Sequence, residues 1–136
     1  MAEEKQLALT QANIRYLLAI EALDQNDSGV RCVDVAQALG ITKPSVHSMM
    51  NTLKQLSLLE KSRYGTIHLT AEGKRIAQQY QGWFKSISHH FAPLLNNEHD
   101  VNTVACALMA ELPEGSMQAM CERMDQIEVT QTCLAQ

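Results

Sequence analysis

The sequence predicts a mainly α-helical protein with one small β-hairpin, and three patterns support this prediction. Apolar residues recur at helical spacing in several separate segments. Between residues 58 and 70 the period changes to two, which is typical of a pair of strands. This hairpin pattern directly follows two short helical patterns that are separated by Gly40. Helix, turn, helix and hairpin in this order predict a winged helix-turn-helix domain, with further helices after it.

Two helices are expected before that turn. Residues 11–25 carry apolar side chains at helical spacing and follow Thr10, a residue type that caps helix N-termini. Val33, Ala36 and Leu39 then form the apolar face of a second helix. The glycine after it supplies the backbone freedom that a tight turn requires.

A third helix is predicted to begin near Lys43. Thr42 is a good N-cap, and Pro44 suits the first turn because the amides there have no partner within the helix. Val46 and Leu53 recur on an inward face, which leaves short polar groups near the N-terminus and cations beyond them. A helix that reads DNA needs this arrangement. The residues predicted on the outer faces are Lys43, Ser45, His47, Ser48, Asn51 and Lys54.

The hairpin is expected from residues 58–61 and 66–70, with a turn at Tyr64-Gly65. Lys61 and Arg63 lie near this turn, where a wing can contact a phosphate or the minor groove. Although the chain of 136 residues carries a net charge of -4, residues 41–75 hold six Lys and Arg against two Glu, a local balance of +4. Because affinity for DNA follows local phosphate contacts, we expect this segment to bind double-stranded DNA. The predicted DNA-binding residues are Thr42, Lys43, Pro44, Ser45, His47, Ser48, Asn51, Lys54, Lys61 and Arg63. The alternative is that these lysines only solubilise the surface.

Composition narrows the class of protein further. The hydrophobic fraction of 46% is sufficient for a core, and no apolar run is long enough to cross a membrane. Without a signal-peptide pattern, we expect a cytoplasmic protein. No phosphate-binding loop, nucleophile elbow or paired carboxylates occur, so an enzyme is not predicted. The four cysteines form no CxxC pair and are expected to be reduced.

The segment after the hairpin is predicted to be helical. Thr70 should cap a long helix that runs from residue 71 to about 93. A turn at 96–100, a helix at 101–112 and a last helix capped by Ser116 follow. Because so few residues cannot bury all the apolar faces of these helices, we expect a homodimer through residues 71–129. We therefore divide the chain into a DNA-binding domain, 1–72, and a helical dimerisation domain, 73–136. The residues expected at the dimer contact are Trp83, Phe84, Ile87, Met120 and Met124.

The order of these elements resembles a known family, the metal-dependent repressors of the diphtheria toxin repressor and manganese transport regulator group. The resemblance rests on the VAQAL sequence at 35–39, on PSV at 44–46 and on LTAEGK at 69–74. It covers most of the chain, in the shorter form of the family that lacks a third domain. The resemblance implies a dimeric repressor that binds an inverted-repeat operator. It also implies that Mn(II) or Fe(II) activates the repressor.

The family's metal ligands, carried over by position, are mostly missing. The positions on the first helix fall at Arg15 and Leu18, the histidine of the long helix at Phe84, and the C-terminal cluster at Cys106, Met109 and Ala110. Only Cys106 matches a ligand type of the family. Arginine and hydrocarbon side chains cannot replace O and N donors, so we expect the usual switch to be lost or altered.

Three alternatives stay open. A relocated site for a divalent transition metal could use His89, His90, His99 and Cys106, with Glu111 nearby, although surface histidines and a core thiol are the favoured explanation of these residues. A thiol sensor could use the cysteines at 32, 106, 121 and 133. A winged-helix module could also bind an acidic protein and no DNA. The operator and the effector signal cannot be derived from the sequence.

Overall fold

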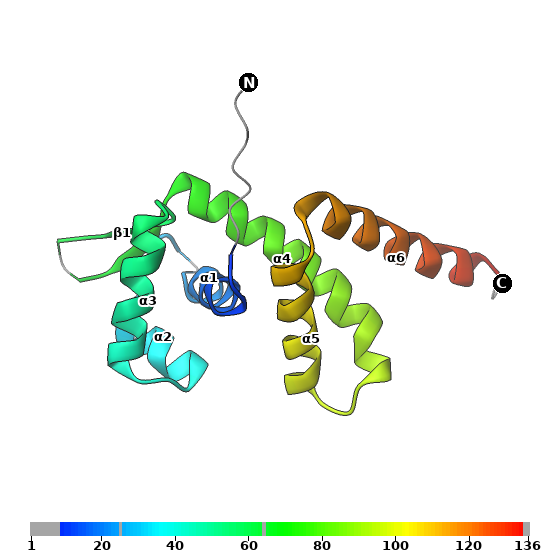
Figure 1. The fold of residues 1–136 in the computed structure, drawn as a ribbon, viewed down its shortest axis with the longest axis horizontal. Helices are drawn as coiled ribbons and strands as arrows, with labels where there is room; N and C mark the ends of the chain where they lie inside the picture. Colours follow the sequence, from blue (N-terminus) through cyan, green and yellow to red (C-terminus); the bar gives the residue numbers. More distant parts are fainter. Residues whose placement is uncertain (1–8, 25, 64, 135–136) are drawn as a thin grey trace, which may run out of the picture. The chain divides into compact units, whose positions relative to one another are not determined.

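The structure is a computed structural model that describes residues 9–24, 26–63 and 65–134. It is mainly α-helical with one two-stranded hairpin, as the sequence predicts. Within the described ranges, no helix is both long and apolar enough to cross a membrane. The elements in chain order are α1 (Gln11–Leu23), α2 (Cys32–Leu39), α3 (Lys43–Gln55), β1 (Leu59–Lys61), β2 (Ile67–Leu69), α4 (Ala71–Phe91), the 3-10 turn η1 (Ala92–Leu94), α5 (Glu98–Glu111) and α6 (Glu114–Leu134) (Figure 1).

Two compact units share these elements. The first covers Ala12–Tyr80. The second includes residues 9–11 and the chain from Gln81 onward, so one boundary lies within the long helix α4. The domain boundary predicted after residue 72 separates residues that bind DNA from residues that form the dimer. Because it is defined by function, it stays a prediction.

The core of the first unit forms where α1 packs against the helix-turn-helix. Ile14, Leu17 and Ile20 of α1 are fully buried. Val35 of α2 is also fully buried, whereas Val33, which the sequence placed on the inner face, is half-buried. Burial of such side chains stabilises a fold by about 1.5 to 3 kcal/mol each, so this core holds the helix-turn-helix in place.

The turn and the cap predicted between α2 and α3 are confirmed. Gly40 ends α2 in the left-handed conformation, with a φ of 66°. Thr42 has extended backbone geometry, and its side chain accepts a hydrogen bond from the amide of Ser45 at 3.4 Å. Pro44 lies in the first turn of α3. Gly40, which ends α2, and Thr42, which caps the start of α3, therefore determine the short connection between the two helices.

The hairpin is antiparallel, and Leu59 pairs with Leu69 in its register. A third strand-like segment, which the sequence did not reveal, adds to it. Val30 and Ile67 form a two-way backbone bridge, with N···O distances of 2.9 and 2.7 Å. Because Val30 lies two residues before the start of α2, this bridge ties the hairpin to the helix-turn-helix.

In the second unit the later part of α4 packs with α5 and α6. Trp83 and Ile87 of α4 and Met109 of α5 are buried. The indole N–H of Trp83 donates to Gln118 on α6 at 3.1 Å. A mixed apolar and polar contact of this kind fixes the rotation of α6 about its axis.

The boundaries of α5 and α6 correct two sequence expectations. Residues 98–100, predicted as a turn, form the first turn of α5, because the side chain of Asn97 accepts a 2.8 Å hydrogen bond from the Asp100 amide and caps the helix. Ser116 does not cap α6, which already begins at Glu114. Its first turn is closed by the 3.0 Å bond from the Met117 amide to the Pro113 carbonyl.

Candidate nucleic-acid interface

The α3 helix presents two chemically distinct faces. Val46 and Leu53 are completely buried, and Met50 is 8% exposed. Every residue that the sequence assigned to the outer faces of α3 is exposed. The helix therefore offers solvent a surface of hydroxyl, imidazole, amide and ammonium groups. These exposed residues are Lys43, Ser45, His47, Ser48, Asn51 and Lys54.

The first turn of this surface is ordered by its own cap. The hydroxyls of Thr42 and Ser45 lie 2.9 Å apart, in addition to the bond from the Ser45 amide. His47 and Asn51 are one helical turn apart and therefore lie on the same side of α3. This side carries a ring nitrogen and a side-chain amide, groups that can donate to and accept from base edges.

Two of the six cations between residues 41 and 75 are neutralised by neighbours. Lys74 lies 2.7 Å from the Asp27 carboxylate, and Arg75 forms a bidentate pair with Glu72. The Lys74 ammonium group lowers the pKa of Asp27. Both pairs lie outside α3 and the hairpin.

The other four cations of this segment are on α3 and the hairpin, and all are exposed. In the ranges that the structure describes, no ion pair involves any of them. Within residues 41–75, the positive charge that is available to a polyanion is thus concentrated on these two adjacent elements. The four residues are Lys43, Lys54, Lys61 and Arg63.

The hairpin tip has a defined backbone path. The Ser62 amide donates to the Thr66 carbonyl at 2.8 Å, and the Gly65 amide donates to Ser62 at 3.2 Å. Gly65 has a φ of 80°, a conformation that favours glycine. The side-chain hydroxyls of Ser62 and Thr66 are also hydrogen-bonded across the hairpin. These bonds hold the segment that carries Lys61 and Arg63.

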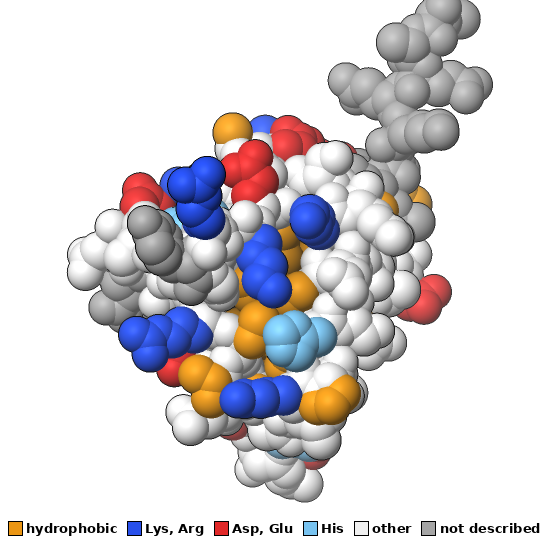
Figure 2. Space-filling model, turned by 90° about the vertical axis from the view of Figure 1, so that its left-hand side faces the viewer, with side chains coloured by type: hydrophobic (Ala, Val, Ile, Leu, Met, Phe, Trp, Pro, Cys, Tyr) orange, Lys and Arg blue, Asp and Glu red, His pale blue; other side chains and the backbone are white. Residues whose placement is uncertain are grey.

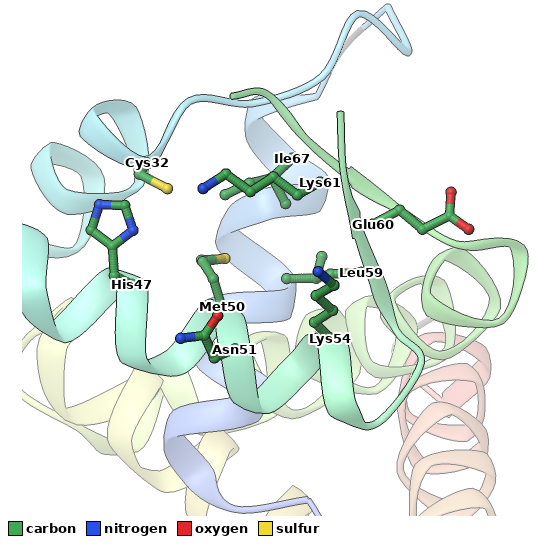
Figure 3. A pocket seen from close by; sticks show the side chains of 9 residues that line it. All are labelled: Cys32, His47, Met50, Asn51, Lys54, Leu59, Glu60, Lys61 and Ile67. Atoms are coloured by element: carbon green, nitrogen blue, oxygen red, sulfur yellow. The ribbon is translucent and has the colours of Figure 1, made fainter. Parts of the chain in front are cut away.

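The corner between α3 and the hairpin is hollowed. Figure 2 shows this face, with hydrophobic side chains at the bottom of a depression and lysine, arginine and histidine side chains around it. The depression corresponds to a small pocket, which we call the corner pocket (Figure 3). Sequence reasoning did not find it, because its residues come from four separate elements. It is lined by Cys32, His47, Met50, Asn51, Lys54, Leu59, Glu60, Lys61 and Ile67.

Comparison with known proteins finds similarity in sequence over the N-terminal half of the chain. The model of the IclR helix-turn-helix domain matches residues 14–63, which span α1 to the hairpin. The transcriptional regulator MntR of Escherichia coli O6:H1 is 34% identical over 64 residues, which are 47% of this chain and 41% of that protein. Over this segment the chain is therefore similar to helix-turn-helix transcriptional regulators. The match spans less than half the length of the curated relative.

Solved structures share the fold over a larger part of the chain. The manganese regulator SloR superposes with a TM-score of 0.68 at 22% identity, over 85% of this chain and 52% of that chain. IdeR from T. acidophilum superposes with a TM-score of 0.63 at 23% identity, over 82% and 53%. Identities this low establish the shared fold alone.

The residues at the metal positions implied by the family do not fit Mn(II) or Fe(II). Arg15 is exposed, and its guanidinium cannot ligate. Leu18 and Phe84 are half-buried hydrocarbons. Cys106 and Met109 are each 2% exposed, and they offer only soft sulfur donors. Hard divalent ions prefer carboxylate, carbonyl and imidazole ligands, none of which this set contains.

The candidate ligands of a relocated metal site lie on α4 and α5. The rings of His89 and His90 meet edge to face, with their centroids 5.2 Å apart. His90 Nδ1 lies 2.9 Å from the Ser86 carbonyl, His99 is exposed at the start of α5, and Cys106 is buried. Among the described residues, no three His, Cys, Asp or Glu side chains form a group that could hold a metal ion.

The cysteines differ in their accessibility. Cys32 is half-buried at the first turn of α2, and Cys121 is buried, which raises the pKa of its thiol. Together with Cys106, these residues are free thiols. Cys133, the fourth candidate for a thiol sensor, has a side chain that lies outside the described residues.

Proposed function

We propose that this MntR-like chain regulates transcription by placing α3 in the major groove of double-stranded DNA and the hairpin against the adjacent backbone. One observation carries the proposal. The four exposed cations of residues 41–75 that have no ion pair within the described chain all lie on α3 and the hairpin. An exposed polar helix next to a cationic hairpin matches the requirement of winged-helix binding.

Base reading is assigned to the side chains near the N-terminal half of α3. Ser45, His47 and Asn51 carry the short donors and acceptors that reach base edges, and asparagine pairs well with adenine. Phosphate contacts are assigned to the four free cations, together with Ser48 and the first turn at Thr42 and Pro44. In this assignment the cations provide affinity for DNA, and the polar groups provide sequence specificity.

We further propose that the protein binds DNA as a homodimer through residues 71–129. Phe84, Met120 and Met124 are half-buried in the single chain, so each retains apolar surface for a partner. Trp83 and Ile87 are buried within the chain, and we assign them the support of this surface. A two-fold dimer would favour an inverted-repeat operator. Light scattering at micromolar concentration tests this assembly, and a monomer would contradict it.

The metal switch of the family is proposed to be lost at its usual position. The support is chemical, because an arginine, a leucine, a phenylalanine and an alanine occupy positions that need O and N donors. The regulator would then act as a repressor that answers a different signal, or none.

A mobility-shift experiment with genomic fragments tests the central proposal. The full chain should retard a subset of fragments in the presence of competitor DNA. A protein-interaction module with the same fold would retard none of them at any protein concentration that keeps it folded. Single substitutions on α3 and the hairpin then identify which residues contact the DNA.

A further inference from the structure

The core of the first unit contains a buried polar side chain that is bonded to the helix we assign to DNA. Asn13 of α1 is 5% exposed, and among the described residues no other polar or charged side chain is buried. The side-chain amide of Asn13 donates to the Met49 sulfur of α3 at 3.0 Å, and α1 lies beside α3 (Figure 1). Asn13 therefore connects α1 to α3 by a directional contact.

Stability alone is a poor explanation of an asparagine at this position. Removing a side-chain amide from water costs free energy unless hydrogen bonds compensate it, and a thioether is only a weak acceptor. A leucine of similar shape would fill the space between α1 and α3 without this cost. What leucine lacks is the directional hydrogen bond to Met49, and we therefore looked for a role of Asn13 in the orientation of α3.

Met49 lies at the border between the buried and the exposed face of α3. It is half-buried, whereas Ser45, one helical turn before it, and Thr52, three residues after it, are both exposed. Ser45 is among the residues that we assign to base reading. The contact from Asn13 is thus made next to a side chain whose exact position decides which base it can meet.

Resting on the proposed function, we infer that Asn13 is a positioning residue for base reading, because its hydrogen bond to Met49 fixes the rotation of α3 about its axis. The contacts of the buried Val46 and Leu53 are non-directional and specify this rotation less sharply. Side chains that recognise a ligand must be held within about 0.5 Å and 10–20° of the productive geometry. Flexible lysine side chains, in contrast, still reach phosphates after a small rotation. Loss of the hydrogen bond therefore lowers sequence discrimination and leaves the affinity for DNA of any sequence nearly unchanged.

Two substitutions remove the hydrogen bond from its two ends. Asn13→Leu removes the donor, and Met49→Leu removes the acceptor but keeps an apolar side chain of similar volume. Met50→Leu is the matched control, because Met50 is the buried neighbour of Met49 on α3 and does not accept the Asn13 hydrogen bond.

Each variant, and the double variant of Asn13→Leu and Met49→Leu, is titrated with two duplexes. One has a mixed sequence, and the other is selected by the wild type from a random-sequence pool. The ratio of the two affinities measures discrimination. A variant that is merely less stable loses both affinities by the same factor, so its ratio does not change. The melting temperature of each variant is recorded as well.

We expect Asn13→Leu and Met49→Leu each to lower the discrimination ratio about fivefold, the effect of losing one hydrogen bond, while Met50→Leu keeps the ratio of the wild type. Because both substitutions remove the same bond, the double variant should lose no more discrimination than either single variant. Met49→Leu carries the test if Asn13→Leu does not fold.

An unchanged ratio in Met49→Leu, an equal loss in Met50→Leu, or additive losses in the double variant would overturn the inference and leave the proposed function intact. A wild type that enriches no sequence from the pool would contradict the proposed function itself.

Discussion

Gly73, in the first turn of α4, lies directly against the backbone carbonyl of Leu58. A Cβ at this position would overlap the Leu58 oxygen, which also accepts the 3.0 Å hydrogen bond from the Thr70 amide. The Thr70 hydroxyl in turn donates to the Ser57 carbonyl at 2.8 Å and accepts from the Gly73 amide at 3.0 Å. The segment that follows α3 and the start of α4 are thereby held together at the base of the hairpin.

The close approach at Gly73 predicts that Gly73→Ala destabilises the protein. The backbone must shift to admit a methyl group, and overpacking of this kind costs about 1 to 3 kcal/mol. Gly82 of the same helix is the matched control, because a Cβ there meets no other atom within 4 Å. Gly82→Ala should stabilise by about 0.5 to 1 kcal/mol through helix propensity. Urea denaturation measures both, and equal effects of the two substitutions would contradict the packing argument.

The Asp27 and Lys74 pair predicts a small acid-sensitive contribution to stability. The hydrogen bond from Lys74 lowers the pKa of Asp27 below its value in the unfolded chain. The contribution is therefore complete above the unfolded pKa and is lost as the pH falls through the lowered value. Asp27→Asn keeps the shape of the side chain and removes its charge. Between neutral pH and pH values below the pKa of Asp27, the denaturation midpoint of this variant should fall less than that of the wild type. A parallel fall in the two proteins would disprove the linkage.

The exposed cations of the hairpin predict a uniform loss of affinity when they are removed. Lys61→Ala and Arg63→Ala should each weaken binding to every duplex and reduce the slope of log K against log salt by about one. Lys85→Ala is the control, because this exposed lysine lies on α4, away from the hairpin in sequence. Fluorescence anisotropy across a salt series gives the slopes. A loss confined to one operator sequence would mean that these residues read bases.

The substituted metal positions predict that Mn(II) and Fe(II) have no effect. With Arg15, Leu18, Phe84 and Ala110 at these positions, neither ion should raise the melting temperature or the affinity for DNA. A site filled at a hundredfold excess over its dissociation constant would stabilise the fold by about 2.7 kcal/mol. A rise in both quantities that a chelator reverses would contradict the proposed loss and direct attention to His89, His90, His99 and Cys106.

Local signals in the sequence were sufficient for the helix-turn-helix. Gly40, Thr42 and Pro44 act within a few residues of their own position, so the boundaries of α2 and α3 could be predicted. The start of α5 was missed because Asn97 sits in a polar segment that also resembles a turn. Its role as a helix cap is evident only from the structure, in which its side chain accepts a hydrogen bond from the Asp100 amide.

Features that depend on long-range contacts could not be predicted. The bridge from Val30 to Ile67 joins residues that no periodicity relates. The corner pocket likewise brings together Cys32, His47 and Lys61 from three elements. The outward-facing residues of α3 could be predicted, because the buried residues of a helix define the face that stays exposed. The corner pocket beside them could not be predicted, because it depends on how the hairpin packs against α3.

The most direct test of the central claim is the affinity of a His47→Ala and Asn51→Ala double variant for an operator isolated with the wild type. Both residues are exposed on one side of α3, and each loss should cost about 1 to 3 kcal/mol at the operator while binding to mixed-sequence DNA stays nearly unchanged. Gln78→Ala, an exposed polar residue on α4, should behave like the wild type. If the double variant, folded as the wild type, binds the operator with normal affinity, α3 is not the recognition helix.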